Sequence, residues 1–425
     1  MIKQNLTSFL LLLAITLVIS SCNSAAKPIE INTNSKESQD KPYVILISLD
    51  GFRWDYVEQY NPPALSSFIK NGAKAESLIP VFPSKTFPNH YSIATGMYPD
   101  KHAIIGNSFF NYDKNEIYSI GNREQVTDGS FYEGSPLWVE AEQAGMISAS
   151  FFFVGSEAEI KGVRPTYYYD YDGGVNNSTR VNQALKWLEL PASKRPHLIT
   201  MYFSDMDDAG HKFGPNNEAE IKKALFNLDT HLGDLFKGIK ETGLPVNIIV
   251  VSDHGMADLS VSNLIPLEDV TNDDLFLTID SGSILNIHPK NKTDVETVFE
   301  LLKSKENHFK VYKTEDTPGF EYTPTSKNWG PIQVLPDYNY YFASERRIES
   351  KKASGNLRSG VHGYDPIYKE MHGVFYANGP AIKTGASISS LRNIHIYPLI
   401  LELLDLDIPE NIDGNLEDIK CVLKN

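Results

Sequence analysis

An almost unbroken apolar segment runs from Tyr43 to Leu49 and ends directly in Asp50 and Gly51. A strand that is apolar on both faces has to be buried on both faces, and such strands occur in parallel sheets that helices cover on either side. In open sheets of this kind, active sites lie at the carboxyl ends of the strands. The segment therefore predicts a central parallel strand with Asp50 as a candidate functional residue at its tip.

Four further apolar runs follow along the chain, at residues 147–154, 198–203, 247–252 and 373–377. Stretches with helical spacing separate them. The clearest is a stripe of apolar residues from Ile221 to Ile239 with the period of an α-helix. Strands that alternate with helices in this way predict a three-layer α/β domain with a mainly parallel central sheet.

The pattern changes between residues 282 and 350. We expect a strand at 283–287, a helix opened by the capping-box spacing of Thr293 and Glu296, and another strand at 310–312. Residues 314–339 are rich in Pro, Tyr and Thr, which is typical of an irregular wall or lid. We interpret residues 282–350 as a small α+β subdomain inserted in one catalytic domain that spans 41–425.

The N-terminus has the pattern of a targeting segment. An apolar stretch from Phe9 to Ile19 is short for a membrane span, and Ser20-Ser21-Cys22 follows it as in a bacterial lipobox. We expect a signal peptide at 1–21 and a lipid-anchored tether at 22–40. The chain would then be a bacterial lipoprotein in the periplasm or at the cell surface, anchored to the membrane at Cys22. An ordinary signal peptide with an incidental cysteine is the alternative.

The charge balance excludes one class of partner. The chain has 39 basic and 54 acidic residues and a net charge of -15, so it lacks the excess of Lys and Arg with which proteins wrap polymeric nucleic acid. A small anion could still bind if a metal ion supplied positive charge. Cys22 and Cys421 stand at opposite ends of the chain, which leaves no disulfide framework.

Four short segments are dense in Asp and His, and three of them follow apolar runs. They are Asp50-Gly51, Asp207 to His211, Asp253-His254-Gly255 and His362 to Asp365. Taken singly, Asp-Gly is a common turn and a lone His is usually structural. Together, three Asp and three His are enough for two zinc-type sites, each with a position left open. A pair of divalent ions about 4 Å apart suits phosphoryl transfer.

Residues 81–90 supply a candidate nucleophile. Pro83 and Pro88 bracket a stretch in which Thr86 can stand at the start of a helix, where amide groups and a metal ion could stabilise an alkoxide. On these residues alone the alternative is a rigid loop in which the threonine only caps residues 89–91.

The motifs, taken in their order along the chain, resemble those of the type I phosphodiesterase, or nucleotide pyrophosphatase/phosphodiesterase, family of the alkaline phosphatase superfamily. The resemblance extends over about residues 42 to 415 and rests on Asp50, Pro83 to His90, Thr95 to Pro99, His102 to Asn107, Asp207 to Pro215, Ser252 to Met256 and His362 to Asp365. It implies an alkaline-phosphatase-like core.

The resemblance also implies two zinc ions per chain. Asp50, Thr86, Asp253 and His254 would surround one of them, and Asp207, His211 and His362 the other. Asp205 and Asp208 compete with Asp207 for the ligand role, and the separation of four residues between Asp207 and His211 follows the family motif.

For the substrate, the resemblance implies that Thr86 attacks phosphorus and that Asn107 donates to a non-bridging phosphate oxygen. Phe87 and Tyr168 would stack on a nucleobase, although the run from Tyr167 to Tyr169 makes a shift by one residue easy.

The expected protein is thus a zinc-dependent hydrolase of small nucleotide diesters and pyrophosphates. It would release nucleoside 5'-monophosphates through a covalent threonine intermediate. A phosphodiesterase for lipid or choline headgroups on the same scaffold is one alternative, because an acyl channel would use similar aromatic residues. A surface-anchored protein that binds metal without turnover is the other.

Overall fold

Strand β1 (Tyr43–Leu49) is central in the computed structural model, which describes residues 33–424. The expected signal peptide and Cys22 lie outside the described residues. At the end of the expected tether, the buried side chain of Asn34 donates to the carbonyl oxygens of Ala192 and Arg195 and accepts from the amide of Ile147. The folded body therefore includes residues from Asn34 onward, ahead of the predicted boundary at 41.

The main sheet contains eight strands in the order β19-β2-β18-β9-β1-β8-β6-β7. Strands β8 (Leu198–Phe203) and β9 (Val246–Val251) flank β1 on its two sides and run parallel to it. Strands β6 (Ser148–Phe151) and β7 (Tyr167–Tyr169) extend the parallel part beyond β8.

The other side of the sheet is mixed. Strand β18 (Phe375–Asn378) runs antiparallel to β9, and β2 (Ala73–Ala75) runs antiparallel to β18, with β19 (Ala386–Ile388) at the edge. The mainly parallel α/β sheet predicted from the sequence is confirmed.

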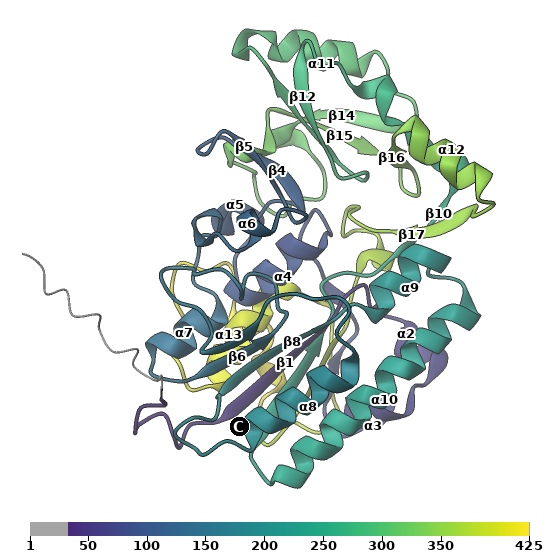
Figure 1. Cartoon of the computed structure of the whole chain (residues 1–425). Coiled ribbons are helices and arrows are strands. Elements are labelled where there is room, and N and C mark those ends of the chain that lie inside the picture. Colours follow the sequence, from purple (N-terminus) through teal and green to yellow (C-terminus); the bar gives the residue numbers. More distant parts are fainter. Residues whose placement is uncertain (1–32, 425) are drawn as a thin grey trace, which may run out of the picture. The chain divides into compact units, whose positions relative to one another are not determined.

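Alternate side chains of β1 enter two different hydrophobic cores, because successive residues of a strand point to opposite faces. Val44 and Leu46 pack in the core under α4 (Thr86–Thr95), α7 (Leu137–Gln143) and α13 (Ile396–Leu403). Ile45, Ile47 and Leu49 pack in the core under α3 (Pro63–Lys70), α8 (Asn177–Leu188) and α10 (Glu218–Thr242). Figure 1 shows these helices in layers on the two faces of the sheet, which is the expected three-layer arrangement.

A second, smaller sheet lies within the predicted insertion. Its order is β12-β13-β15-β14, with every neighbouring pair antiparallel. The strands are β12 (Phe276–Asp280), β13 (Leu285–Pro289), β14 (Phe309–Lys313) and β15 (Ile332–Pro336). Helix α11 (Val295–Lys303) covers one face, and the sheet and helix share a separate hydrophobic core. The sheet starts at Phe276, before residue 282, and β15 occupies part of the stretch expected to be irregular.

Residues 33–424 contain no helix with both the length and the apolar character needed to span a bilayer.

Candidate active site

Three carboxylates meet where three neighbouring parallel strands end. Asp50 directly follows β1, Asp253 comes two residues after β9, and Asp207 lies in the first turn of α9 (Asp205–Phe213), which follows β8. The amide of Asp207 donates to the carbonyl oxygen of Asp50, with 3.0 Å between N and O. A Cβ atom on Gly51 would lie 2.7 Å from the Cα of Asp207, so only glycine lets the two segments approach this closely.

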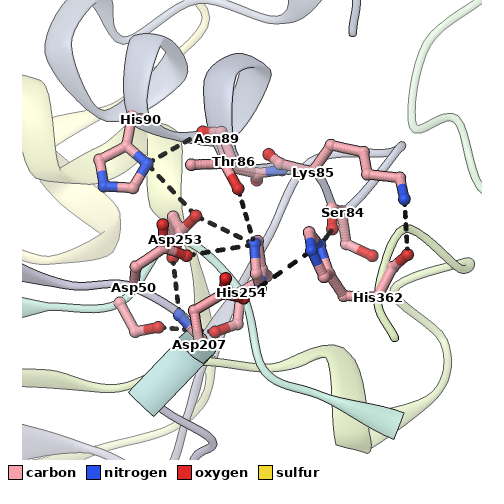
Figure 2. A network of polar contacts seen from close by, with 12 residues as sticks. Asp50, Ser84, Lys85, Thr86, Asn89, His90, Asp207, Asp253, His254 and His362 are labelled. Carbon is pink, nitrogen blue, oxygen red and sulfur yellow. Dashed lines mark hydrogen bonds and ion pairs between the residues drawn. The ribbon is translucent and has the colours of Figure 1, made fainter. Parts of the chain in front are cut away.

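Each of these carboxylates has a buried oxygen without a hydrogen-bond partner. Tyr202 donates to Asp50 Oδ2 at 2.6 Å and the amide of Gly51 donates to Asp253 Oδ1 at 3.3 Å, whereas Asp50 Oδ1, Asp253 Oδ2 and Asp207 Oδ1 accept no hydrogen bond. Figure 2 shows the carboxylates gathered around His254. A buried carboxylate oxygen without a donor is costly unless a cation faces it.

The three predicted histidines are oriented in the same way. The Nδ1 atoms of His211, His254 and His362 each lie 2.8 Å from a backbone carbonyl oxygen, of Gly360, Gly255 and Ser84 respectively. An Nδ1–H group that donates to a carbonyl leaves Nε2 with a free lone pair, which is the tautomer that ligates metals. The Nε2 atom of His254 lies 3.1 Å from Asp253 Oδ2 and that of His211 lies 3.4 Å from Asp207 Oδ1.

Burial shifts the pKa values of Asp50, Asp207, His254 and His362 toward the neutral forms, whereas at Asp253 the adjacent His254 and His90 outweigh burial and lower the pKa to about 2. Burial raises the pKa values of Asp50 and Asp207 well above the usual range, and neighbouring carboxylates raise them further. Burial also lowers the pKa of His254 to about 4 and that of His362 well below the usual range, and these two rings stack with centroids 3.6 Å apart. A cluster of this kind binds divalent cations, which convert the buried carboxylates to their charged forms.

Two groups of side chains have ligand atoms close enough together to share a metal ion. One group is Asp207, His211 and His362, and the other is Asp50, Asp207 and His254, with all ligand atoms of a group within 4.8 Å of one another. Carboxylate oxygens and imidazole nitrogens, with no cysteine among them, are ligands typical of catalytic sites for zinc and related divalent metals. The unpartnered carboxylate oxygens and the orientation of the histidines therefore fit a metal centre.

Helix α4 begins at Thr86, which places the hydroxyl at the end of the helix where amide groups are free. Thr86 Oγ1 lies 3.3 Å from His254 Nε2 and so faces the cluster (Figure 2). The preceding loop is held by Asn89, whose Nδ2 donates to the carbonyl oxygens of Pro83 and Lys85 and whose Oδ1 accepts from the amide of Val81.

Asn107 lies beside the start of the same helix. Its Oδ1 accepts from the amide of Phe87 at 3.0 Å. Because this contact fixes the amide group, the Nδ2 hydrogens of Asn107 remain to donate to another acceptor. Asn107 and Thr86 both line the largest cavity at the cluster, which has a volume of about 370 Å³.

The cavity has aromatic walls as well as the polar cluster. Phe87, Phe152, Phe153, Tyr171 and Tyr202 line it. Tyr168 does not: its side chain is 38% exposed and packs under the guanidinium of Arg164. The structure therefore brings Phe87 into the site but places Tyr171, three residues further along, where Tyr168 was expected.

Sequence reasoning missed the side chains that hold the predicted ligands. Tyr202, in β8, donates to Asp50, and His90 Nδ1 lies 3.2 Å from Asp253 Oδ2 and 2.9 Å from the carbonyl oxygen of Thr86. His90 belongs to the motif that carries Thr86, so its spacing of one helical turn was a usable signal. The sequence did not identify Tyr202 as a functional residue, because it lies within an apolar strand.

The two aspartates that competed with Asp207 for the ligand role, Asp205 and Asp208, form hydrogen bonds outside the cluster. Asp205 accepts both of its hydrogen bonds from Asn177, and Asp208 accepts from Ser204. Neither is in a metal-ligand group of the described residues, which leaves Asp207 as the residue of α9 that faces His211 and His362.

Comparison with known proteins decides the family. The sequence profile of the type I phosphodiesterase/nucleotide pyrophosphatase family matches residues 44–365. The chain is 34% identical to human ectonucleotide pyrophosphatase/phosphodiesterase family member 1 over 91% of its length, and 33% identical to the venom phosphodiesterase of Naja atra over 92%. This chain belongs to the type I phosphodiesterase/nucleotide pyrophosphatase family. It spans 42% and 47% of the lengths of these two relatives.

Solved structures of this phosphodiesterase family share the fold. Murine ectonucleotide pyrophosphatase/phosphodiesterase 5 superimposes with a TM-score of 0.82 at 30% identity, over 90% of this chain and all of that one. A second structure of the murine protein, an inactive threonine-to-alanine variant in complex with AMP, superimposes with the same TM-score at 29% identity. The predicted alkaline-phosphatase-like fold and the predicted family are thus confirmed.

Proposed function

We propose that this chain hydrolyses nucleotide phosphodiester and pyrophosphate bonds, with two zinc ions, and releases nucleoside 5'-monophosphates. The observation that carries the proposal is the position of Thr86, whose hydroxyl lies at a helix N-terminus, against the Asp and His cluster and beside an aromatic cavity. The murine relative supports it in two ways, because that protein binds AMP and its variant with alanine in place of a threonine is inactive.

Thr86 would act as the nucleophile. Its oxygen attacks phosphorus, the bond to the leaving oxygen breaks, and the nucleoside monophosphate becomes attached to the threonine. Water then hydrolyses this ester. In this scheme Phe87 and Tyr171 provide apolar faces for the nucleobase, because both line the cavity next to Thr86.

The carboxylates and histidines would hold the zinc ions in two groups. One is Asp207 with His211 and His362. The other is Asp50 with Asp253 and His254, where His254 Nε2 lies 3.4 Å from Asp50 Oδ1 and 3.1 Å from Asp253 Oδ2. When bound, the ions would lower the pKa of the attacking oxygen and stabilise negative charge on the phosphoryl group. Tyr202 and His90 position Asp50 and Asp253 for this role.

Asn107→Ala is expected to lower kcat by about 10²-fold or more, because an Nδ2 donor to a phosphate oxygen is worth most in the transition state. Asn107→Asp keeps the acceptor for the Phe87 amide but removes the donor, so it should be at least as slow. Steady-state kinetics on a nucleotide ester would check both variants. A fully active Asn107→Asp protein would show that this side chain only holds the helix start.

The substrate class is tested by comparing p-nitrophenyl thymidine 5'-monophosphate, p-nitrophenylphosphorylcholine and p-nitrophenyl phosphate, with the soluble protein and added zinc. We expect the nucleotide diester to be hydrolysed best. A preference for the choline ester would identify a headgroup phosphodiesterase, and no hydrolysis of any ester by the zinc-loaded protein would identify a binding protein.

We also propose that the protein is a lipoprotein outside the cytoplasm, anchored through acylated Cys22, on the basis of the lipobox-like Ser20-Ser21-Cys22. Cys22→Ala would then move the protein from the membrane fraction to the soluble fraction. Retention in the membrane would contradict the anchor.

A further inference from the structure

A second cavity, of about 270 Å³, shares residues with the first. Asn107, His211 and His362 line both, so the two cavities meet at the metal-ligand cluster. Their other walls differ. The first is rich in Phe and Tyr side chains, whereas the second contains Lys85, Asp280 and Arg347, with Tyr341 as its one Phe or Tyr residue.

Lys85 is a buried cation without a counter-ion. Its side chain is 5% exposed, and Nζ donates to the carbonyl oxygen of His362 at 2.9 Å and to the hydroxyl of Tyr341 at 3.4 Å. An ammonium group has three donors, so one remains for an acceptor in the cavity. No carboxylate forms an ion pair with Lys85 within residues 33–424.

The path of the Lys85 side chain depends on a glycine. A Cβ atom on Gly363 would lie 2.3 Å from Lys85 Cε and 2.1 Å from Ser283 Oγ, and Gly363 has a φ of +108°. Only glycine is compatible with both conditions. The loop that carries His362 therefore packs directly against the Lys85 side chain.

Arg347 provides a second cation from the inserted subdomain. It lies on α12 (Glu345–Ala353), is exposed, and lines the cavity without an ion pair in the described part of the chain. Asp280 is the carboxylate in this wall, and its Oδ1 accepts from the amide of Gly282. Burial raises the pKa of Asp280, while that amide and the charges of Lys85 and Arg347 act against the increase. Because two cations and one carboxylate line this cavity, its wall carries a net positive charge.

We propose that this second cavity binds an anionic leaving group, namely the pyrophosphate or phosphorylated part of a nucleoside polyphosphate, and that Arg347 selects for it. The inference rests on the proposed function. In an in-line displacement the leaving group departs on the side away from the nucleophile, so it needs a space distinct from the one that holds the nucleoside.

With ATP as the substrate, a bond forms between Thr86 Oγ1 and the α-phosphorus, and the bond from that phosphorus to the bridging oxygen breaks. The bridging oxygen leaves with the electron pair as part of pyrophosphate, and the threonine proton passes to solvent. Lys85 and Arg347 lie where this negative charge accumulates. A choline or other cationic leaving group would be repelled.

The test compares ATP with p-nitrophenyl thymidine 5'-monophosphate, whose leaving group carries no phosphate. Arg347→Ala is expected to lower the ratio of kcat/KM for ATP to kcat/KM for the ester by about tenfold, the loss of one exposed charge-assisted contact, and Arg347→Glu by more. Arg346→Ala is the matched control, because Arg346 is the exposed neighbour on the same helix and does not line the cavity. It should leave the ratio within about twofold.

The outcomes separate this inference from the proposed function. If the wild-type protein hydrolyses neither compound, the proposed function is wrong. If it hydrolyses both and Arg347→Ala leaves the ratio unchanged, only the assignment of the second cavity is wrong. An equal effect of Arg346→Ala would also contradict it, since a general change in surface charge would then explain the loss.

Discussion

Thr86→Ala should lower the rate of nucleotide ester hydrolysis by at least about 10³-fold, because it removes the group that forms the covalent intermediate. Zinc content should stay close to that of the wild-type protein, since the carboxylates and imidazoles of the cluster are untouched. The measurement is steady-state kinetics together with elemental analysis of the same preparation.

Thr230→Ala is the matched control for this variant. Thr230 is exposed on α10 and donates to the carbonyl oxygen of Phe226 in its own helix, so its loss should leave both rate and zinc content unchanged. Thr86→Ser should retain part of the activity, because the nucleophilic oxygen remains. Wild-type rates in Thr86→Ala would show that the threonine only starts the helix.

The second large effect is expected for Asp207→Asn, which should lose metal as well as activity. Asp207 Oδ1 lies 3.4 Å from His211 Nε2 and 3.8 Å from His362 Nε2, and Asp207 belongs to both candidate ligand groups. Removing its charge weakens the cation sites, so we expect less than one zinc ion to remain tightly bound and kcat/KM to fall by at least about 10²-fold.

Asp205→Asn controls for the loss of a carboxylate from the same helix turn, because Asp205 contacts Asn177 rather than the cluster. It should keep its zinc. Treatment of the wild-type protein with a chelator should abolish activity, and added zinc should restore it. Full zinc occupancy in Asp207→Asn would contradict the ligand assignment.

The main sheet could be predicted because its central strands are buried on both faces. The bounds predicted for β1 and β8 agree with the structure, and both are apolar without interruption. The direction of β18 could not be predicted, because an apolar run does not encode whether its neighbour is parallel. β15 was missed because it follows a long irregular stretch, and because its two antiparallel partners, β13 and β14, are separated from it in sequence.

The candidate site was partly predictable for a different reason. Asp50 and Asp253 follow apolar strands, and strand ends in a parallel sheet meet at one edge. The aromatic wall was less predictable, because residues 167–171 contain four tyrosines and one aspartate, and only packing determines which ring faces inward. Tyr171 lines the cavity and Tyr168 faces outward.

The measurement that tests the central claim most directly is hydrolysis of ATP in water labelled with heavy oxygen, followed by mass spectrometry of both products. If Thr86 attacks the α-phosphorus and water then releases the nucleotide, the label appears in AMP and the pyrophosphate is unlabelled. Label in pyrophosphate, or formation of ADP and phosphate in place of AMP, would contradict the account.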